Sequence, residues 1–316
     1  MSYPYIVLGI TILIGAILLD IIFGEPREWI HPDRILGRLI SYMEPPFRSL
    51  NGGVAGGFLL AVVFIAAITS VAYFVLAVSS PVAFVFVIVG IAYLKAGVSV
   101  SRNASTARRV VRLLENGELE AARDALIASV RRDTSELDTG HVVSAVIEML
   151  GQSLLYDVFS PPLFFFAIFG PVGALFVKLV VTLDRRMGKR NKRYFEFGRW
   201  AAIISTVVNY IPARIAGYMT LLGAELLNYR IPRLSLRSVS RLVESVNSGW
   251  TMGAMAVAMN IRLEKMGSYI LNDDGFEPGI GDIKKAINIY YMTVYSSIIL
   301  IVIPIMIIVF LGTSAL

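Results

Sequence analysis

The apolar residues of this chain are grouped in long runs that polar stretches separate. Four runs continue without interruption, at residues 5–23, 53–78, 81–95 and 292–311. A helix of about 20 apolar residues crosses a bilayer, so we predict that these runs are membrane spans, the third being short. The break at residues 79–81, Ser-Ser-Pro, predicts a tight hairpin between the second and third spans.

Two further apolar runs are interrupted. Residues 158–183 contain Gly170 and Pro171, and residues 200–222 contain Pro212. A full crossing by the first run would place the basic island at residues 185–199 outside, although loops rich in Lys and Arg normally stay in the cytoplasm. Irregular backbone is tolerated at membrane depth where protein or water surrounds it. We therefore predict that each run enters the membrane and returns as two half-helices.

Outside these runs the apolar spacing is that of amphipathic helices. Residues 34–43 predict one such helix, and residues 105–134 predict an αα-hairpin that turns at Asn116 and Gly117. Residues 137–156 predict a mixed helix, and residues 223–282 are largely polar. The fold class that we predict is all-α: a polytopic α-helical integral membrane protein with broken or re-entrant helices. We interpret residues 1–316 as a single membrane-embedded domain, with the soluble helical hairpin at residues 102–141 inside it.

Composition supports the membrane interpretation and narrows the chemistry. Hydrophobic residues make up 56% of the chain, above the roughly 45–50% of soluble proteins. The net charge of +6 is explained by basic cytoplasmic loops, so we expect no nucleic-acid partner. The absence of cysteine excludes disulfides, thiolate metal sites and a cysteine nucleophile. Because His31 and His141 are the two histidines, a multi-histidine metal site within one chain is also excluded.

Carboxylates, arginines and amides remain as candidate groups. Carboxylates with substrate phosphates are typical of Mg²⁺ sites, and guanidinium groups bind phosphate or carboxylate with two parallel hydrogen bonds. Several of these residues also fit a plain structural role. Glu25 and His31 precede prolines and fit turns that leave the membrane, residues 132–134 fit a helix end and cap, and the island at 185–199 fits a topology signal. Asn209 and Arg214 favour a site most strongly, since they lie within an apolar segment.

Several motifs occur in a specific order along the chain. They read LLDIIFGEPREWIHPDRILGRLI, VRRDTSELD, AVIE, TLDRRMGKRNKRYFEFG, NYIPAR and VNSGWTMGAMAVAMNIRLEK. In these motifs the chain resembles the adenosylcobinamide-phosphate synthase (cobinamide synthase) family of cobalamin, or vitamin B12, biosynthesis. The resemblance extends from Asp20 to about Lys285.

The resemblance implies a reaction and its partners. Members of the family are taken to attach aminopropanol or its phosphate to a propionate carboxylate of (adenosyl)cobyric acid, through an amide bond formed at the expense of ATP. The implied cofactors are Mg²⁺ and ATP. The implied partners are the corrinoid substrate, aminopropanol or its phosphate, the lipid bilayer and other cobalamin-assembly proteins. The implied location is the cell membrane, as a multi-pass protein with its motif-bearing loops in the cytoplasm.

Residue roles follow from the motif match and residue type. The expected catalytic residues are acidic, with the first two also expected as metal ligands: Asp184, Glu148, Asp133 and Asp20. The expected substrate-binding residues are Glu25, Arg27, His31, Arg132, Arg190, Asn191, Arg193, Tyr194, Asn209 and Arg214.

The chain also departs from the family pattern. At several positions where the family typically has acids or amides, an ungapped comparison finds Gln152, Ser153, Tyr156, Ser205 and Thr206. Loss of several carboxylates keeps a second interpretation open, because amide synthesis must neutralise phosphate charge. In that interpretation the protein is a divergent, non-catalytic corrinoid- or phosphate-binding membrane paralogue, or an assembly partner of the synthase.

Overall fold

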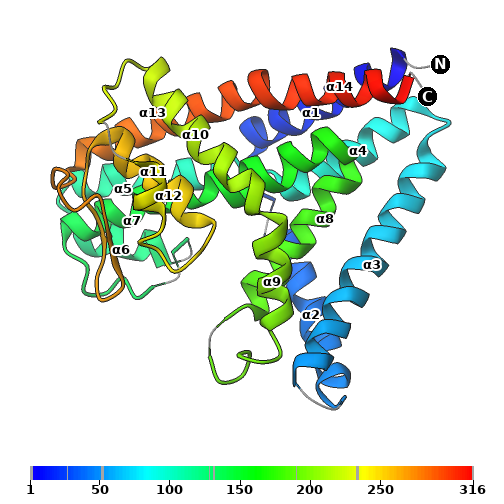
Figure 1. Ribbon diagram of the computed structural model, residues 1–316, viewed down its shortest axis with the longest axis horizontal. Coiled ribbons are helices and arrows are strands. Elements are labelled where there is room, and N and C mark those ends of the chain that lie inside the picture. Colours follow the sequence, from blue (N-terminus) through cyan, green and yellow to red (C-terminus); the bar gives the residue numbers. More distant parts are fainter. Residues whose placement is uncertain are drawn as a thin grey trace. The chain divides into compact units, whose positions relative to one another are not determined.

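The computed structural model describes residues 3–26, 28–50, 53–127, 129–130, 132–189, 191–232 and 235–314 (Figure 1). Most of these residues are in helices and the two strands have three residues each, which confirms the predicted all-α class. In chain order the elements are α1 (Tyr3–Phe23), a 3₁₀ turn η1 (Glu28–Ile30), α2 (Pro32–Arg48), α3 (Gly53–Ser79), α4 (Ala83–Gly97), α5 (Ser101–Glu115), α6 (Leu119–Ile127), α7 (Thr139–Ser153), a π-helix η2 (Leu154–Phe164), α8 (Phe165–Met187), α9 (Arg199–Val208), α10 (Tyr210–Leu226), α11 (Leu236–Ser240), α12 (Ser248–Met259), β1 (Leu263–Lys265), β2 (Tyr269–Leu271), α13 (Ile280–Ser297), a π-helix η3 (Ile298–Val302) and α14 (Ile303–Ser314).

The chain forms two compact units, and each is built from separate segments. Unit 1 comprises residues 1–98, 161–209 and 302–316, and unit 2 comprises residues 99–160 and 210–301. The chain crosses from one unit to the other at four places, each of which departs from regular α-helix. These places are between α4 and α5, inside η2, between α9 and α10, and inside η3. The interpretation of the whole chain as a single domain stays a prediction.

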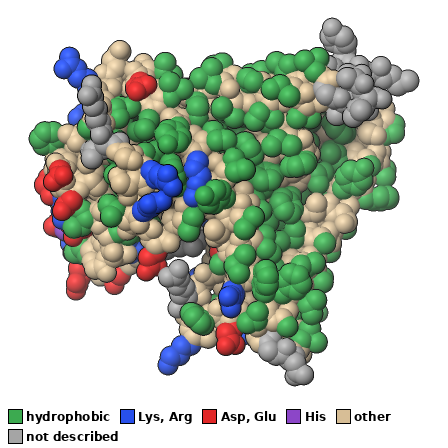
Figure 2. All heavy atoms as spheres, in the orientation of Figure 1, with side chains coloured by type: hydrophobic (Ala, Val, Ile, Leu, Met, Phe, Trp, Pro, Cys, Tyr) green, Lys and Arg blue, Asp and Glu red, His purple; other side chains and the backbone are tan. Residues whose placement is uncertain are grey.

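Within the described part of the chain, five helical segments are long and apolar enough to cross a membrane: Ile6–Phe23, Gly53–Ser79, Thr139–Phe159, Phe165–Met187 and Ile280–Val309. The pair α4 and α5, bent by 42°, adds a sixth if it forms one span. This confirms a polytopic α-helical membrane protein. The spans differ in their surroundings. In the most apolar 18-residue stretch of Thr139–Phe159, 89% is buried inside the protein, whereas in that of Gly53–Ser79 only 28% is buried. Figure 2 shows mostly hydrophobic side chains over α3, the span with the smaller buried share.

Four local predictions can be compared with the structure: two concern amphipathic helices, and two concern breaks in the apolar runs. The amphipathic helix is α2, and the αα-hairpin is α5 and α6, with Gly117 at φ +80° in the turn between them. The break after Ser79 is present, since α4 begins at Ala83. The interruption near Pro171 is also present, because Gly170 has φ 66° and ψ −161°, a backbone conformation that glycine adopts without strain. These four predictions are confirmed, and the return of residues 158–183 to the same side of the membrane stays a prediction.

The break assigned to Pro212 is in a different place. The helix is interrupted at Asn209, which caps the end of α9, and its side chain donates to the Ser205 carbonyl at 2.7 Å. Pro212 lies in the first turn of α10, where the missing N–H has no intrahelical partner to lose. The prediction was therefore wrong by three residues, because a proline at a helix start does not end a helix.

Residues 223–282 contain more structure than their polar composition predicts. The helix α12 lies there and is buried along almost its whole length. It is followed by an antiparallel hairpin in which β1 pairs with β2, with Leu263 opposite Leu271 and Lys265 opposite Tyr269. Figure 1 shows α5, α6, α7 and α12 lying together in unit 2, and β1 packs against α7.

The core of unit 1 joins α2, α3, α8 and α9. Its largest buried members include Ile40, Phe64, Leu179 and Phe197. The approach of α3 to the segment before α9 is close, because a Cβ on Gly57 would collide with the carbonyl oxygen of Phe197. This packing holds the basic island against α2 and α3 without requiring a regular helix there.

Candidate functional site

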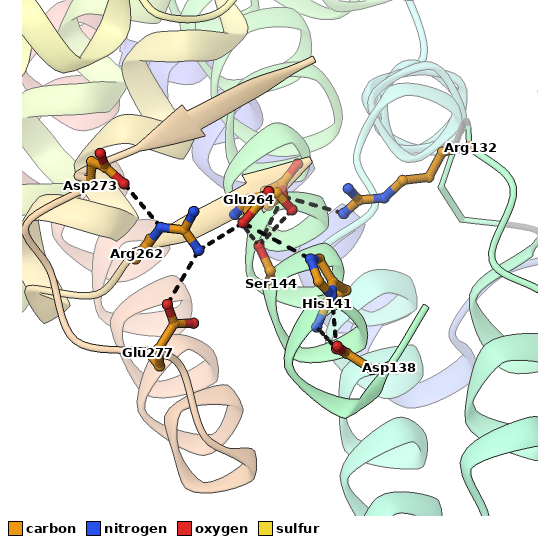
Figure 3. Close-up of polar contacts among 9 residues, drawn as sticks. Arg132, Asp138, His141, Ser144, Arg262, Glu264, Asp273 and Glu277 are labelled. Carbon is orange, nitrogen blue, oxygen red and sulfur yellow. Dashed lines mark hydrogen bonds and ion pairs between the residues drawn. The ribbon is translucent and has the colours of Figure 1, made fainter. Parts of the chain in front are cut away.

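The polar cluster of unit 2 is built around the start of α7. Asp138 caps this helix, and its Oδ1 accepts from the backbone N–H of His141 at 2.8 Å. That hydrogen bond holds the pKa of Asp138 below its usual value. Ser144 and Glu148 lie one turn apart on α7, where Glu148 contacts Arg132 in the preceding loop and Ser144 contacts Glu264 in β1. Figure 3 shows Ser144 with Arg132 and Glu264 around it.

Glu148 is the centre of this cluster. It is 3% exposed and accepts hydrogen bonds on both carboxylate oxygens. Oε1 accepts from Arg132 Nη2 at 3.2 Å and from Ser144 Oγ at 3.1 Å, and Oε2 accepts from the Tyr269 hydroxyl at 2.7 Å. Burial, and then the charge of Glu148, raise the pKa of Tyr269 well above its usual value, so the phenol keeps the proton that it donates.

Arg132 has donors in excess of its partners. Its side chain is 12% exposed, and Nη1 is buried without a hydrogen-bond partner among the described residues. A guanidinium group carries five N–H donors and no acceptor. Leaving such a donor buried and unpaired costs free energy, so the arrangement fits a guanidinium that awaits an anion.

The β1–β2 hairpin is fastened to this cluster. The backbone N–H of Glu264 donates to Ser144 Oγ at 2.8 Å, and the Glu264 carboxylate lies 4.0 Å from His141 Nε2. Arg262 contacts three carboxylates, those of Glu264 at 2.7 Å, Asp273 at 3.0 Å and Glu277 at 3.2 Å (Figure 3). A continuous chain of polar contacts therefore runs from the cap of α7 to the loop after β2.

Unit 1 contains a buried ion pair between two of its membrane helices. Asp20 on α1 is 0% exposed, and its Oδ1 lies 2.5 Å from Lys95 Nζ on α4. Charges at membrane depth are tolerated when they are paired. Because no oxygen of Asp20 reaches the surface, its position favours joining the two helices over contact with a substrate.

A second cluster in unit 1 surrounds the start of α2. His31 caps this helix, accepting from the backbone N–H of Asp33 at 3.2 Å, and its Nε2 lies 2.9 Å from Glu25 Oε2. Asp33 pairs with the buried Lys178 on α8 at 2.7 Å and accepts from Thr182 Oγ1 at 3.1 Å. Burial acts to raise the pKa of Asp33, but Lys178 and then Arg185 outweigh it and hold that pKa well below its usual range.

The basic island is held by a buried carboxylate on α2. Glu44 accepts from Arg48 at 2.6 Å, from Arg193 at 3.0 Å and from the Tyr194 hydroxyl at 3.1 Å. Burial acts to raise the pKa of Glu44, but these three hydrogen bonds outweigh it and lower the pKa. Asn191 Oδ1 accepts from the backbone N–H of Tyr194 at 3.0 Å, which closes a turn within the island.

The remaining predicted site residues are dispersed. Asp184 is half-buried near the end of α8, and its carbonyl accepts from Gly188 at 2.7 Å. Asp133 is exposed, and the backbone N–H of Ser135 donates to it at 3.0 Å and lowers its pKa. In unit 2, Arg214 donates to Asn247 at 2.7 Å and lies 3.4 Å from the centre of the Tyr210 ring. Arg27 and Arg190 lie outside the described residues.

The structure thus brings Arg132 together with Glu148, Glu25 with His31, and Arg193 with Tyr194. Sequence reasoning missed their partners Tyr269, Asp33, Lys178 and Glu44. Lys178 was visible as a lone cation within an apolar run, which signals a paired or functional charge. Tyr269 gave no such signal, because its hairpin was not predicted.

A metal site is not formed by the described residues alone, since no three acidic or histidine side chains among them gather as ligands. Both oxygens of Glu148 already accept from protein donors, so a Mg²⁺ ion there would have to displace at least one of them. The present arrangement of Glu148 therefore does not fit a metal ligand. Mg²⁺ often relies on one or two carboxylates together with substrate phosphates, and the assignment of Asp184 stays a prediction.

Comparison with known proteins identifies the family. The family model described as CobD/Cbib protein matches residues 13–298. The chain belongs to the CobD/Cbib protein family. Both units of this CobD/Cbib family member lie within the matched region apart from the chain ends, so the match covers the polar clusters of each.

Curated relatives of this CobD/Cbib family member match over nearly their whole length. The probable cobalamin biosynthesis protein CobD of Thermoplasma acidophilum is 42% identical over 299 residues, covering 94% of this chain and 98% of the relative. That of Thermoplasma volcanium is 41% identical over 300 residues, covering 95% and 98%. The cobalamin biosynthesis protein CobD of Dehalococcoides mccartyi is 34% identical over 279 residues, covering 84% and 87%. No solved structure matches this chain.

Proposed function

We propose that this protein is a membrane-embedded amide ligase of cobalamin biosynthesis. It attaches aminopropanol or its phosphate to a propionate carboxylate of (adenosyl)cobyric acid and consumes ATP. Membership of a family whose curated relatives are named cobalamin biosynthesis proteins supports the pathway. The observation that carries the chemistry is Arg132, a mostly buried guanidinium that Glu148 holds on one side and that keeps Nη1 unpaired among the described residues.

The proposed reaction has two steps. The corrinoid carboxylate attacks the γ-phosphorus of ATP, which releases ADP and forms an acyl phosphate. The amine nitrogen of aminopropanol then attacks the acyl carbon, inorganic phosphate leaves, and the amine loses a proton. ATP and the corrinoid carboxylate are anions, and so is aminopropanol phosphate when it is the amine used, so a fixed guanidinium in a partly dry site lowers the free energy of bringing the reactants together.

Other residues take supporting roles in this proposal. Asp133 is the candidate general base, because it is an exposed carboxylate beside Arg132; the hydrogen bond from Ser135 lowers its pKa and so makes it a weaker base than an ordinary aspartate. Mg²⁺, when bound with ATP, would neutralise phosphate charge. The proposal needs no side chain of this chain to bind the ion. We place the protein in the cell membrane with residues 132–138 and 185–199 on the cytoplasmic side. Reporter fusions in those two segments test this orientation.

One observation favours the second candidate function, a non-catalytic corrinoid- or phosphate-binding paralogue or assembly partner. At positions where the family typically has acids or amides, this chain has neutral side chains that form hydrogen bonds with their neighbours. Ser153 Oγ lies 3.3 Å from the Tyr290 hydroxyl, Ser205 accepts from Asn209, and Thr206 donates to the Ala202 carbonyl at 2.8 Å. Gln152 donates to the sulfur of Met252 at 3.3 Å.

A reconstituted assay separates the two functions. Purified protein in nanodiscs is incubated with cobyric acid, Mg-ATP and aminopropanol phosphate, and the amide product and ADP are measured by mass spectrometry. The ligase proposal expects one ADP for each amide formed. Binding of the corrinoid without product, in an assay in which a motif-complete relative turns over, would overturn the ligase proposal. The combined substitutions Gln152→Glu, Ser205→Asp and Thr206→Asp then test whether the missing acids account for the inactivity.

A further inference from the structure

We propose that Arg132 is a two-sided anchor, in which Nη2 is fixed by Glu148 and Nη1 receives an oxyanion oxygen of one substrate. Glu148 and Tyr269 are then positioning residues that act through Arg132. This inference rests on the proposed function for the identity of the substrates. It differs from an assignment of Glu148 as metal ligand or base, because the carboxylate here orients a cation.

The first step is the fixation of Glu148. Three donors reach its two oxygens from three different parts of unit 2: the loop before α7, α7 itself and β2. At 3% exposure the carboxylate has little water to compete with them. A carboxylate restrained in this way allows one position for the guanidinium that pairs with it.

The second step concerns the hairpin that carries Tyr269. Its register places Tyr269 opposite Lys265, and Ser144 binds the backbone of Glu264 in the facing strand. Arg262 ties the same strand to the loop after β2 through Asp273 and Glu277. The hairpin is therefore rigidly placed on α7, and the Tyr269 hydroxyl is the atom through which it reaches Glu148 (the hydroxyl–carboxylate contact is 2.7 Å).

The third step is the chemistry of the missing partner. Nη1 of Arg132 is closed to solvent and has no hydrogen-bond acceptor among the described residues. The 12% of the side chain that is exposed belongs to its other atoms, so an anion reaches Nη1 only when the side chain or its loop shifts. A neutral ligand would accept a hydrogen bond from Nη1 but would bring no negative charge to that side of the Arg132 guanidinium. A phosphate or carboxylate oxygen supplies both the acceptor and the charge, and guanidinium groups bind these anions strongly.

Three substrates of the proposed reaction carry such an oxygen: ATP, aminopropanol phosphate and the corrinoid carboxylate. The experiment therefore measures three dissociation constants separately, with no turnover possible. Cobyric acid, a non-hydrolysable ATP analogue with Mg²⁺, and aminopropanol phosphate are each titrated alone by calorimetry into protein in nanodiscs. The variants are Arg132→Gln, Arg132→Lys, Glu148→Gln and Tyr269→Phe. The control is Tyr291→Phe, since Tyr291 meets Arg108 through its ring.

We expect Arg132→Gln to weaken one of the three ligands by about 10- to 100-fold, and to change the other two less than about twofold. Arg132→Lys should fail to restore binding, because a single ammonium nitrogen cannot occupy both sides of the anchor. Glu148→Gln and Tyr269→Phe should weaken the same ligand, Tyr269→Phe by about three- to tenfold. The control should bind like the unaltered protein.

Two outcomes overturn the proposal. One is equal weakening of all three ligands together with a lower melting temperature, which indicates a structural ion pair. The other is unaltered binding in the Arg132 variants, or binding of none of the ligands by the unaltered protein. Binding that depends on Arg132 but yields no amide in the separate assay would overturn the ligase proposal and leave this one standing.

Discussion

Both units bury a carboxylate beside a basic side chain, but the basic side chain is a lysine in two pairs of unit 1 and an arginine in unit 2. In unit 1, Asp20 on α1 pairs with Lys95 on α4, and Asp33 on α2 pairs with Lys178 on α8. Each of these pairs joins two helices through one carboxylate and one ammonium group. In unit 2, Glu148 pairs with a guanidinium that retains a buried donor with no partner among the described residues.

In our proposal, the Asp–Lys pairs of unit 1 fasten helices to each other, whereas the Arg132–Glu148 pair of unit 2 prepares a guanidinium to bind a ligand. An ammonium group that meets a carboxylate between helices has its single nitrogen engaged, and such pairs can specify which helices pack together. A guanidinium has enough donors to be anchored and still bind a ligand. In our proposal, the excess of donors over acceptors at Arg132 therefore marks the site, and the dense motif at residues 20–32 does not.

The largest effect that we expect is from Asp33→Asn in unit 1. The substitution leaves Lys178, which is 6% exposed, without its carboxylate. Removing one partner of a buried pair costs about 3–5 kcal/mol of stability. Thermal unfolding in detergent measures the loss, while corrinoid binding by the folded fraction should be unchanged.

A matched double variant sharpens this test. Asp33→Asn combined with Lys178→Met removes both charges, and most of the lost stability should return, because an apolar replacement of a buried pair is often neutral. If Asp33→Asn instead keeps its stability and abolishes ligand binding, unit 1 holds the site and the comparison fails.

A smaller effect is expected from Glu44→Gln, which loosens the island at residues 191–198. Hydrogen bonds to a charged group contribute about 1.5–3 kcal/mol, and part of that is lost. Because the pKa of Glu44 is lowered in the folded protein, its contribution is present above its usual pKa and is lost as pH falls through the folded pKa. The stability difference between the two proteins should therefore close in acid.

Trypsin digestion gives a local readout of the same change, since Lys192 and Arg193 are exposed on the island. Cleavage there should accelerate in Glu44→Gln. The control is Glu196→Gln, an exposed glutamate of the same island, for which we expect a change within about 0.5 kcal/mol. Equal cleavage of both variants would show that Glu44 does not hold the island.

The smallest effect is expected from Tyr269→Phe in unit 2, about 1 kcal/mol at neutral pH. The raised pKa of Tyr269 means that its contribution is present below the unfolded value near 10 and is lost as pH rises toward the folded one. The absorbance difference at 295 nm between the two folded proteins should show no tyrosine ionising near pH 10. A step at that pH would mean that Glu148 and burial do not protect the phenol.

The membrane helices could be predicted from the sequence because a bilayer requires long apolar runs and leaves few alternatives. The αα-hairpin and α2 were equally visible from their apolar spacing. Ion pairs were not, since Asp33 and Lys178 are 145 residues apart and nothing in either neighbourhood identifies the other. The hairpin of unit 2 was missed because its strands have three residues each, and packing on α7 decides their position.

The comparison of residues after Glu148 is affected by the π-helix Leu154–Phe164. Such a helix accommodates an extra residue, so a straight count toward Pro161 does not preserve the helix face. Asp157 follows Tyr156, is 5% exposed, and accepts from Asn103 Nδ2 at 3.4 Å. The ungapped comparison placed Tyr156 where the family typically has an acid. The buried carboxylate of Asp157 lies one position further along the chain.

The division of each unit into distant segments has a consequence for biogenesis. Domains commonly fold in the order in which the ribosome releases them. Here unit 1 contains α1 and α8 and also α14, so α14 reaches these partners only after the segments of unit 2 have been synthesised. Unit 1 is therefore completed only after unit 2, and a nascent chain halted before residue 302 holds an unfinished helix bundle for the cell's quality control to recognise.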